Sequence, residues 1–337
     1  MRPQSTTTRR EFLFEAAASG LALAALGRDV LASQQPSGAS GLPTRVLGRT
    51  GERVSILCLG GWHIGSVKDG DQAIRIMHAA VDEGLTFFDN CWDYHDGGSE
   101  EIMGRALDGG RRDKVFLMTK NCERDYEGSM KCLDDSLRRL RTDRIDLWQF
   151  HEIIYDNDPE WVFEKGGMKA ALEARKAGKV RYIGFTGHKH PSIHLSMLDK
   201  PFEWDACQFP VNVLDLHYRS FQKQVLPVCL EKNVGAIGMK GFGGGNGIAR
   251  QAGLTAEEAY RYALSQPIAS EVVGMTTMEQ LQANIALARD FKPMPDAEQT
   301  ALAAKVKPFA TDGRFEQFKS TQNFDGPVHR RQHGFTA

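Results

Sequence analysis

The stretch LTFFDNCWDY, residues 85–94, shows in one place the pattern that decides the fold. Its first part, residues 85–88, is a short apolar run without alternation, which is typical of a parallel strand buried on both faces. A segment with helical periodicity, residues 72–83, precedes it, and Gly84 stands where a left-handed residue would end that helix. The run ends at Asp89 in a polar loop. This order of helix, strand and loop predicts an α/β protein.

The same unit recurs along the chain from Val46 onward. Eight strand–helix pairs in roughly 240 residues predict a closed (β/α)8 TIM barrel. An open doubly wound sheet is the alternative, but the G-x-G-x-x-G motif after the first strand is missing. The expected strands are residues 55–59, 85–88, 115–119, 145–150, 182–186, 206–210, 235–239 and 271–274. The expected helices are residues 72–83, 100–107, 129–140, 168–176, 193–198, 221–232, 256–264 and 278–289.

The N-terminal segment has the pattern of an export signal. Arg9 and Arg10 precede an apolar run at residues 16–26 and a small-residue site that ends at Ala32, which is the twin-arginine (Tat) form of a cleavable signal. The run is shorter than the roughly 20 residues that a membrane span requires. An amphipathic first helix of the folded domain is the alternative. The signal predicts a periplasmic or secreted protein with the Tat export machinery as a partner.

These patterns divide the chain into four segments. Residues 44–54 are expected to form a hairpin that closes the bottom of the barrel, and the C-terminal segment is expected to be irregular apart from a short helix at 297–305. The predicted segments are a signal peptide at 1–32, a linker rich in Ser, Gly and Pro at 33–45, the barrel at 46–292 and a C-terminal tail at 293–337.

Composition narrows the classes of function. The chain has 337 residues, 41% of them hydrophobic, and a net charge of -1, so no overall field attracts nucleic acid. Its six cysteines include no C-x-x-C pair, and a chain of this length can build its core without disulfides. We therefore expect a globular enzyme with free, mostly buried thiols.

Four polar residues fall where the expected strands end. Asp89 ends the second strand, Lys120 the third and His151 the fourth, while Tyr94 lies in the loop after Asp89. Because the active sites of α/β barrels lie at the carboxyl ends of the strands, we expect these side chains to meet. Each alone could be a helix cap, a packing residue or a satisfied polar group. Their arrival at one rim favours a catalytic site.

The chemistry that these residues support is the reduction of a carbonyl by hydride. The developing alkoxide needs a proton, which Tyr94 can donate. We expect Lys120 to lower the pKa of this phenol and Asp89 to keep Lys120 charged. His151 can donate a hydrogen bond to the carbonyl oxygen and orient it.

The set Asp89, Tyr94, Lys120 and His151, together with Ser99-Glu100 and the run Gly104–Leu107, resembles the catalytic tetrad and signature of the aldo-keto reductase family. The resemblance covers roughly residues 46–290. It implies hydride transfer between a nicotinamide cofactor and an aldehyde or ketone (alcohol) substrate, with Tyr94 as the general acid. A histidine in the place of His151 favours carbonyl reduction over double-bond reduction.

The resemblance also implies a set of cofactor residues. Thr186 and Gly187 take the place of the family's Ser-Asn pair at the carboxamide, Gln208 contacts the same group, and Met239 replaces an aromatic residue at the nicotinamide ring. The loop after Met239 would lie near the pyrophosphate. The complete set of implied cofactor residues is Asp89, Thr186, Gly187, Gln208, Met239, Lys240, Gly241, Phe242, Gly274, Met275, Thr276, Gln280 and Asn284.

The choice of dinucleotide depends on the last of these motifs. Members that prefer NADP(H) usually have Lys and Arg where this chain has Thr277 and Gln280, so the 2′-phosphate has fewer cations around it. A helix N-terminus near Thr277 still offers N–H groups to an anion. NADP(H) is the expected cofactor, with NAD(H) as the alternative. The same resemblance implies a substrate pocket walled by Trp62, His63 and Trp92.

Two other functions were considered. His188 and His190 form an H-x-H motif with His194 nearby, which could indicate a metal-dependent barrel hydrolase. No carboxylate partners this motif at a comparable strand end and Pro191 indicates a turn, so no metal site is expected there or elsewhere. The second alternative is a catalytically inactive barrel that binds the cofactor as a sensor or subunit; the complete tetrad argues against it.

Overall fold

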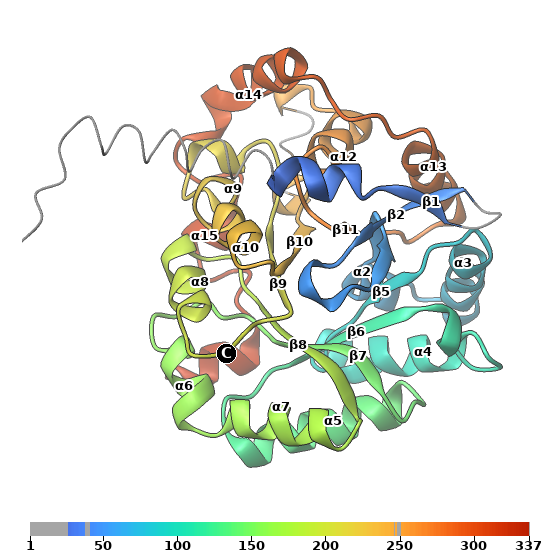
Figure 1. Cartoon of the computed structure of the whole chain (residues 1–337), viewed down its shortest axis with the longest axis vertical. Helices are drawn as coiled ribbons and strands as arrows, with labels where there is room; N and C mark the ends of the chain where they lie inside the picture. Colours follow the sequence, from blue (N-terminus) through green and yellow to red (C-terminus); the bar gives the residue numbers. More distant parts are fainter. Residues whose placement is uncertain (1–25, 38–40, 246, 248–250, 337) are drawn as a thin grey trace, which may run out of the picture.

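Eight parallel strands close into a barrel in this computed structural model, which describes residues 26–37, 41–245, 247 and 251–336 (Figure 1). The strands pair in chain order and the last pairs with the first, as a (β/α)8 barrel requires. All eight expected strands are present, so the predicted barrel is confirmed. The strands are β4 (Leu57–Leu59), β5 (Phe87–Asp89), β6 (Phe116–Asn121), β7 (Ile145–Phe150), β8 (Val180–Thr186), β9 (Ala206–Pro210), β10 (Gly235–Met239) and β11 (Ser270–Val273).

Helices surround the strands on the outside (Figure 1). The expected helix at 221–232 is two helices that meet at Val225, because Pro227 lies in the first turn of the second helix and has no N–H to continue the first. The helices around the barrel are α2 (Gly61–Gly65), α3 (Gly70–Asp82), α4 (Gly98–Ala106), α5 (Tyr126–Arg139), α6 (Asp158–Glu164), α7 (Gly167–Lys176), α8 (Pro191–Leu198), α9 (Phe221–Gln224), α10 (Leu226–Glu231), α12 (Ala256–Leu264) and α13 (Met278–Arg289).

A hairpin closes the amino-terminal end of the barrel, as expected. β2 (Leu42–Val46) pairs antiparallel with β3 (Arg53–Ser55). Leu47 and Val54 are fully buried against the lowest layer of barrel side chains. Gly235 at the start of β10 allows this contact, because a Cβ there would lie 2.5 Å from the Leu47 side chain. The hairpin therefore seals the barrel and leaves the carboxyl ends of the strands as the open end.

The described residues of the segment expected to be a linker, 33–37 and 41–45, are part of the fold instead. β1 (Gln35–Ser37) pairs antiparallel with β2, and together with β3 they form a three-stranded sheet. Arg45 is fully buried and donates to Ile268 O at 2.9 Å and to Leu264 O at 2.8 Å. Composition could not show this, because Ser, Gly and Pro are compatible with a short edge strand as well as with a linker.

The N-terminal segment is only partly described. Residues 26–32 are helical, and Leu26, Asp29 and Val30 line a groove beside the hairpin together with Leu230 and Pro267. Arg9 and Arg10 and most of the apolar run lie outside the described residues. Among the residues that are described, no helix has the length and apolar character to cross a bilayer.

The C-terminal segment differs most from its prediction. Instead of an irregular tail, it forms α14 (Asp296–Ala310), α15 (Gln317–Ser320) and α16 (Pro327–Gln332). α15 and α16 return to the open end of the barrel, where the carbonyl of Phe318 bonds to His188 Nδ1 at 3.1 Å and His333 Nε2 lies 3.1 Å from Asp158. The segment therefore covers part of the mouth, which local periodicity cannot predict.

Arg45 offers a test of whether the former linker belongs to the folded domain. Burial lowers the pKa of its guanidinium to about 10, and its hydrogen bonds satisfy carbonyls near the end of α12. Arg45→Met should lower the free energy of unfolding by about 2–3 kcal/mol, since two buried carbonyls lose a charged donor. Arg75→Met on the exposed face of α3 is the control, with an expected effect below about 0.5 kcal/mol. Equal stabilities in urea unfolding would contradict this role for Arg45.

Candidate active site

The barrel brings the four predicted catalytic residues together at one rim. Asp89 ends β5, Lys120 lies near the end of β6, and His151 follows β7 directly. Tyr94 begins a 3-10 turn after β5. The Nζ atom of Lys120 lies 2.5 Å from Asp89 Oδ1 and 3.2 Å from the hydroxyl of Tyr94. The Tyr94 ring meets the His151 ring edge to face, with centroids 5.7 Å apart.

Lys120 is held in place by three partners. In addition to Asp89 and Tyr94, its Nζ donates to the carbonyl of Asn90 at 2.7 Å. Burial is the largest single influence on the pKa of Lys120 and lowers it, but the charge and hydrogen bond of Asp89, together with Cys91 and Cys58, outweigh burial and the net direction is upward. Lys120 is therefore a buried ammonium whose three N–H bonds all have acceptors.

The expected effect of Lys120 on Tyr94 is not found. Burial raises the pKa of Tyr94 well above its ordinary value, and the negative charge of Asp89 raises it further. The net direction is upward because burial and the surrounding negative groups outweigh the ammonium next to the phenol. Tyr94 therefore keeps its proton at neutral pH, which suits a proton donor.

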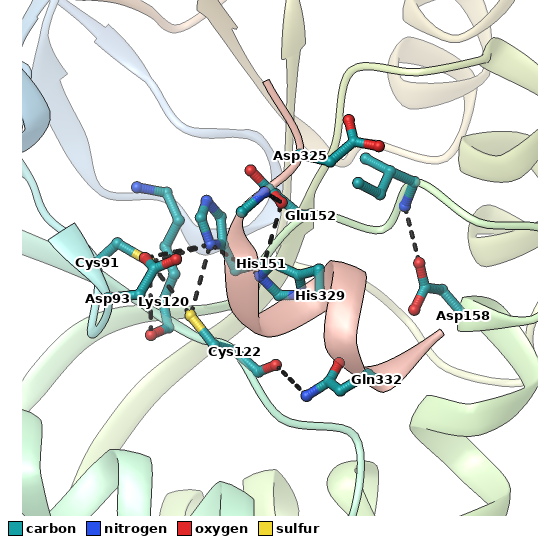
Figure 2. Close-up of polar contacts among 12 residues, drawn as sticks. Cys91, Asp93, Lys120, Cys122, His151, Glu152, Asp158, Asp325, His329 and Gln332 are labelled. Atoms are coloured by element: carbon teal, nitrogen blue, oxygen red, sulfur yellow. Dashed lines mark hydrogen bonds and ion pairs between the residues drawn. The ribbon is translucent and has the colours of Figure 1, made fainter. Parts of the chain in front are cut away.

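His151 is a neutral imidazole in a crowded position. Burial lowers its pKa well below the ordinary value, and the neighbouring His329 and Lys120 lower it further. Its Nδ1 atom lies 3.2 Å from Cys91 Sγ and 3.3 Å from His329 Nε2 (Figure 2). A neutral imidazole donates one hydrogen bond at most, which fits the expected role of orienting a carbonyl oxygen.

The helix α16 forms one wall of the site. Figure 2 shows it against Cys122, His151 and Glu152. Gln332 Nε2 donates to the carbonyl of Cys122 at 3.0 Å, and the N–H of Gly326 donates to Glu152 at 2.7 Å. Burial raises the pKa of Glu152 to about 7. Sequence reasoning missed His329, since residues 178 positions apart in the chain, such as His151 and His329, share no local pattern. It also missed Glu152, although this residue directly follows His151 at the strand end.

The three aromatic residues predicted to wall the pocket have different positions. Trp62 is 52% exposed and meets the Tyr94 ring edge to face at 5.4 Å, so it lies at the pocket entrance. His63 lies on the cofactor side, where a Cβ on Gly274 would come within 2.5 Å of its ring. Trp92 points away from the site: its Nε1 donates to Asp135 on α5 at 3.2 Å. Trp92 is therefore a packing residue, which corrects the prediction for it.

Glu100, part of the signature predicted from the sequence, links the helix α4 to β6 next to Lys120. Glu100 is fully buried on α4, accepts from Thr119 at 2.6 Å and pairs with Arg139 at 3.3 Å. Arg139 also donates to the carbonyl of Trp92 at 2.8 Å. This chain of contacts fixes α4, α5 and the loop that carries Tyr94 relative to β6.

The residues expected to bind the carboxamide of the nicotinamide lie side by side. Thr186, the last residue of β8, and Gln208, in the middle of β9, are register partners, and both are buried. Gln149 Nε2 donates to Gln208 Oε1 at 2.8 Å, which leaves the amide N–H bonds of Gln208 for another acceptor. Gly187 accommodates a close approach, because a Cβ there would lie 2.2 Å from the carbonyl of Ile153. The asparagine that is usual in the family therefore has no room at position 187.

The loop expected to lie near the pyrophosphate follows β10. Met239 is half-buried at the end of that strand, and Lys240 adopts a left-handed conformation with φ of 60°. Burial lowers the pKa of Lys240 to about 8, and its Nζ lies 5.1 Å from the ring centre of Phe318 on α15. Gly241 allows Tyr260 to approach, whereas Phe242 packs edge to face on Tyr260 at 5.1 Å.

The motif expected to bind the adenosine end of the cofactor leads into α13. Gly274 and the buried Met275 follow β11, and Thr277 caps the helix by accepting from Gln280 N at 3.2 Å. Gln280 Oε1 accepts from Thr276 N at 2.8 Å. Asn284 lies one turn further along α13 and is half-buried.

The H-x-H motif does not form a metal site. His188 bonds to the carbonyl of Phe318, His190 Nδ1 caps α8 by accepting from Ser192 N, and His194 Nε2 faces the carbonyl of Gln208. Each imidazole thus has a separate backbone partner. All six cysteines are free and buried, as expected; burial raises the pKa of Cys91 to about 12.

Comparison with known proteins identifies the family. Residues 56–252 match the model of the Aldo/keto reductase family, so this chain belongs to that family. An uncharacterized oxidoreductase of Bacillus subtilis (strain 168), YrpG, is 33% identical over 225 residues, 59% of this chain and 66% of its own length. The aldo-keto reductase yakc [NADP(+)] of Schizosaccharomyces pombe is 31% identical over 218 residues, 57% of this chain and 59% of its own. Both matches span less than two thirds of the relative's length.

Solved structures support the fold. An aldo-keto reductase of Bacillus halodurans, AKR11C1 in its holo form, superposes with a TM-score of 0.67 at 24% identity, over 78% of this chain and 95% of its own. At that identity the likeness concerns the barrel, not the activity.

Proposed function

We propose that this chain is a nicotinamide-dependent reductase of aldehydes or ketones. One observation carries the proposal: the side chains of Tyr94, Lys120 and His151 meet at the carboxyl ends of adjacent strands. Burial raises the pKa of Tyr94 and lowers that of His151, which favours a protonated phenol and a neutral imidazole. Family membership agrees with it. The cofactor, when bound, supplies the hydride.

The residues of this chain supply the proton, stabilise the charges and orient the substrate. Tyr94 holds the proton that the developing alkoxide takes up, and Lys120 stabilises the phenolate that remains. Asp89 keeps Lys120 charged in a site with little water. His151 orients the carbonyl oxygen, and Trp62 at the entrance limits the access of water.

The structure fits a nicotinamide cofactor at the opposite side of the mouth. The amide N–H bonds of Gln208, for which the described part of the chain shows no acceptor, and the neighbouring Thr186 suit a carboxamide, and the first turn of α13 suits an anionic group. NADP(H) is the proposed cofactor because the relative from Schizosaccharomyces pombe is named for NADP(+). NAD(H) is the alternative, because residues 274–284 contain no Lys or Arg.

Tyr94→Phe tests the proton donor. The variant keeps the ring that packs on Trp62 but lacks the hydroxyl, so kcat for a reactive aldehyde should fall by about a hundredfold or more. NADPH affinity, followed by fluorescence titration, should stay within about twofold. Tyr126→Phe, an exposed tyrosine bonded to Glu173, is the matched control and should retain full turnover. Wild-type kcat in Tyr94→Phe would rule out this mechanism.

The same experiment separates the enzyme from a cofactor-binding sensor. A sensor would bind NADPH but would not oxidise it when aldehyde is added to the wild-type complex. An enzyme oxidises the bound cofactor in a single turnover.

Gln280→Arg tests the cofactor site. A guanidinium in the first turn of α13 should strengthen NADPH binding by about tenfold and leave NADH binding unchanged, because only NADPH has the 2′-phosphate. Thr277 is kept because it caps the helix. Gln282→Arg adds the same charge at an exposed position two residues further on, which does not face position 280, and should change neither affinity. Equal tightening of NADH would show that position 280 does not contact this phosphate.

We also propose that the protein is exported by the Tat machinery to the periplasm or beyond. The support is the sequence pattern around Arg9 and Arg10. That route carries folded proteins, so the cofactor could travel inside the barrel. Replacing Arg9 and Arg10 by Lys should retain the precursor in the cytoplasm on cell fractionation, whereas Arg28→Lys should not. Export of the double variant would contradict the proposal.

A further inference from the structure

Four metal-binding side chains meet beside the catalytic residues. Cys91 follows β5, Asp93 follows two residues later, Cys122 follows β6 and His151 follows β7. One ligand atom from each lies within 4.8 Å of all the others, and all of these residues except Asp93 are fully or almost fully buried. Figure 2 shows Cys91, Asp93 and Cys122 gathered around one ring nitrogen of His151.

The separations are those of ligands around one small cation. Cys91 Sγ lies 3.7 Å from Cys122 Sγ, and these sulfurs lie 3.2 and 3.5 Å from His151 Nδ1. Asp93 Oδ1 lies 3.6 Å from the same nitrogen. Tetrahedral zinc, from its bond lengths to sulfur and nitrogen, places two sulfurs about 3.8 Å apart and a sulfur and a nitrogen about 3.5 Å apart.

Hydrogen bonds alone do not explain this arrangement. A ring nitrogen has one proton or one lone pair, yet two thiols, a carboxylate and His329 Nε2 all approach His151 Nδ1. The Oδ1 atom of Asp93 is buried and has no hydrogen-bond donor within the described part of the chain. A bound cation would satisfy that carboxylate and both sulfurs at once, while His329 could remain with Glu152, 3.8 Å away.

We propose that Cys91, Asp93, Cys122 and His151 Nδ1 bind one zinc-type divalent cation. Two sulfur ligands with a nitrogen and an oxygen favour zinc over magnesium or calcium, which prefer oxygen. The two thiols lose their protons to solvent as the thiolates bind. Four protein ligands close a tetrahedral site, so no position remains for the activated water of a hydrolase. The site was not expected from sequence, and its binding does not depend on the proposed reductase activity.

The cation would have two effects on the active site. It would tie the loop before Tyr94 to the ends of β6 and β7. It would also occupy Nδ1 of His151 and so leave the proton on Nε2, the tautomer that can donate to a substrate oxygen. This second effect rests on the proposed function.

Metal binding is tested on the full chain, purified from zinc-supplemented medium without chelator. We expect elemental mass spectrometry to detect one zinc ion per chain. Chelator-stripped protein titrated with Co(II) should show the strong visible bands of a tetrahedral site and a thiolate charge-transfer band. Cys122→Ala should lose most of the charge-transfer intensity, and Cys229→Ala, a buried cysteine on α10, should retain it. Asp93→Asn keeps both sulfurs and should weaken Co(II) binding at least tenfold without loss of the fold.

Several outcomes would overturn the proposal. The first is a chain with reduced thiols that binds neither zinc nor Co(II). The second is a Cys91–Cys122 disulfide, detected by intact mass, in place of the metal. The third is an unchanged cobalt spectrum in Cys122→Ala. Activity gives a separate readout: removal of zinc should lower kcat, with NADPH affinity unchanged, and zinc but not magnesium should restore it. A chain that binds zinc but reduces no carbonyl would retain the site and lose the proposed function.

Discussion

The buried ion pair between Lys120 and Asp89 is the constraint on which the site depends. Both charges are buried, and an ammonium without partners at this depth would cost several kcal/mol. The three acceptors of Lys120 Nζ are supplied by the end of β5 and by the loop after it. The pair therefore fixes β5, β6 and Tyr94 relative to one another, and it can form only if the barrel closes in the observed register.

The C-terminal segment extends this network over the mouth of the barrel. Lys319 is fully buried on α15 between Asp215 and Glu316, at 2.6 and 3.0 Å, so α15 docks through charges as well as apolar contacts. α16 then brings His329 to His151. Buried charges of this kind require specific partners, which gives the segment one position rather than many. The pocket is thus shaped by a part of the chain that lies outside the eight strand–helix units.

The neighbourhood of His151 shows how one rim can combine several chemistries. The ends of β5, β6 and β7 deliver a carboxylate, an ammonium, two thiols and an imidazole within a few residues of each other. Closure of the barrel forces these ends together whatever side chains they carry. A proton donor and a proposed cation site can therefore share one histidine, because its two ring nitrogens point in different directions.

The sequence by itself determined the barrel and the meeting of Asp89, Tyr94, Lys120 and His151, because apolar runs and strand ends are local patterns and the topology places all strand ends at one rim. Only the tertiary structure decided how side chains point and which distant segments return. It turned Trp92 towards α5, paired part of the expected linker as strands and placed His329 beside His151. It also buried Tyr94 next to Asp89, which raises the pKa that Lys120 was expected to lower. These features depend on burial and on contacts between residues far apart in the chain, which no spacing in the sequence records.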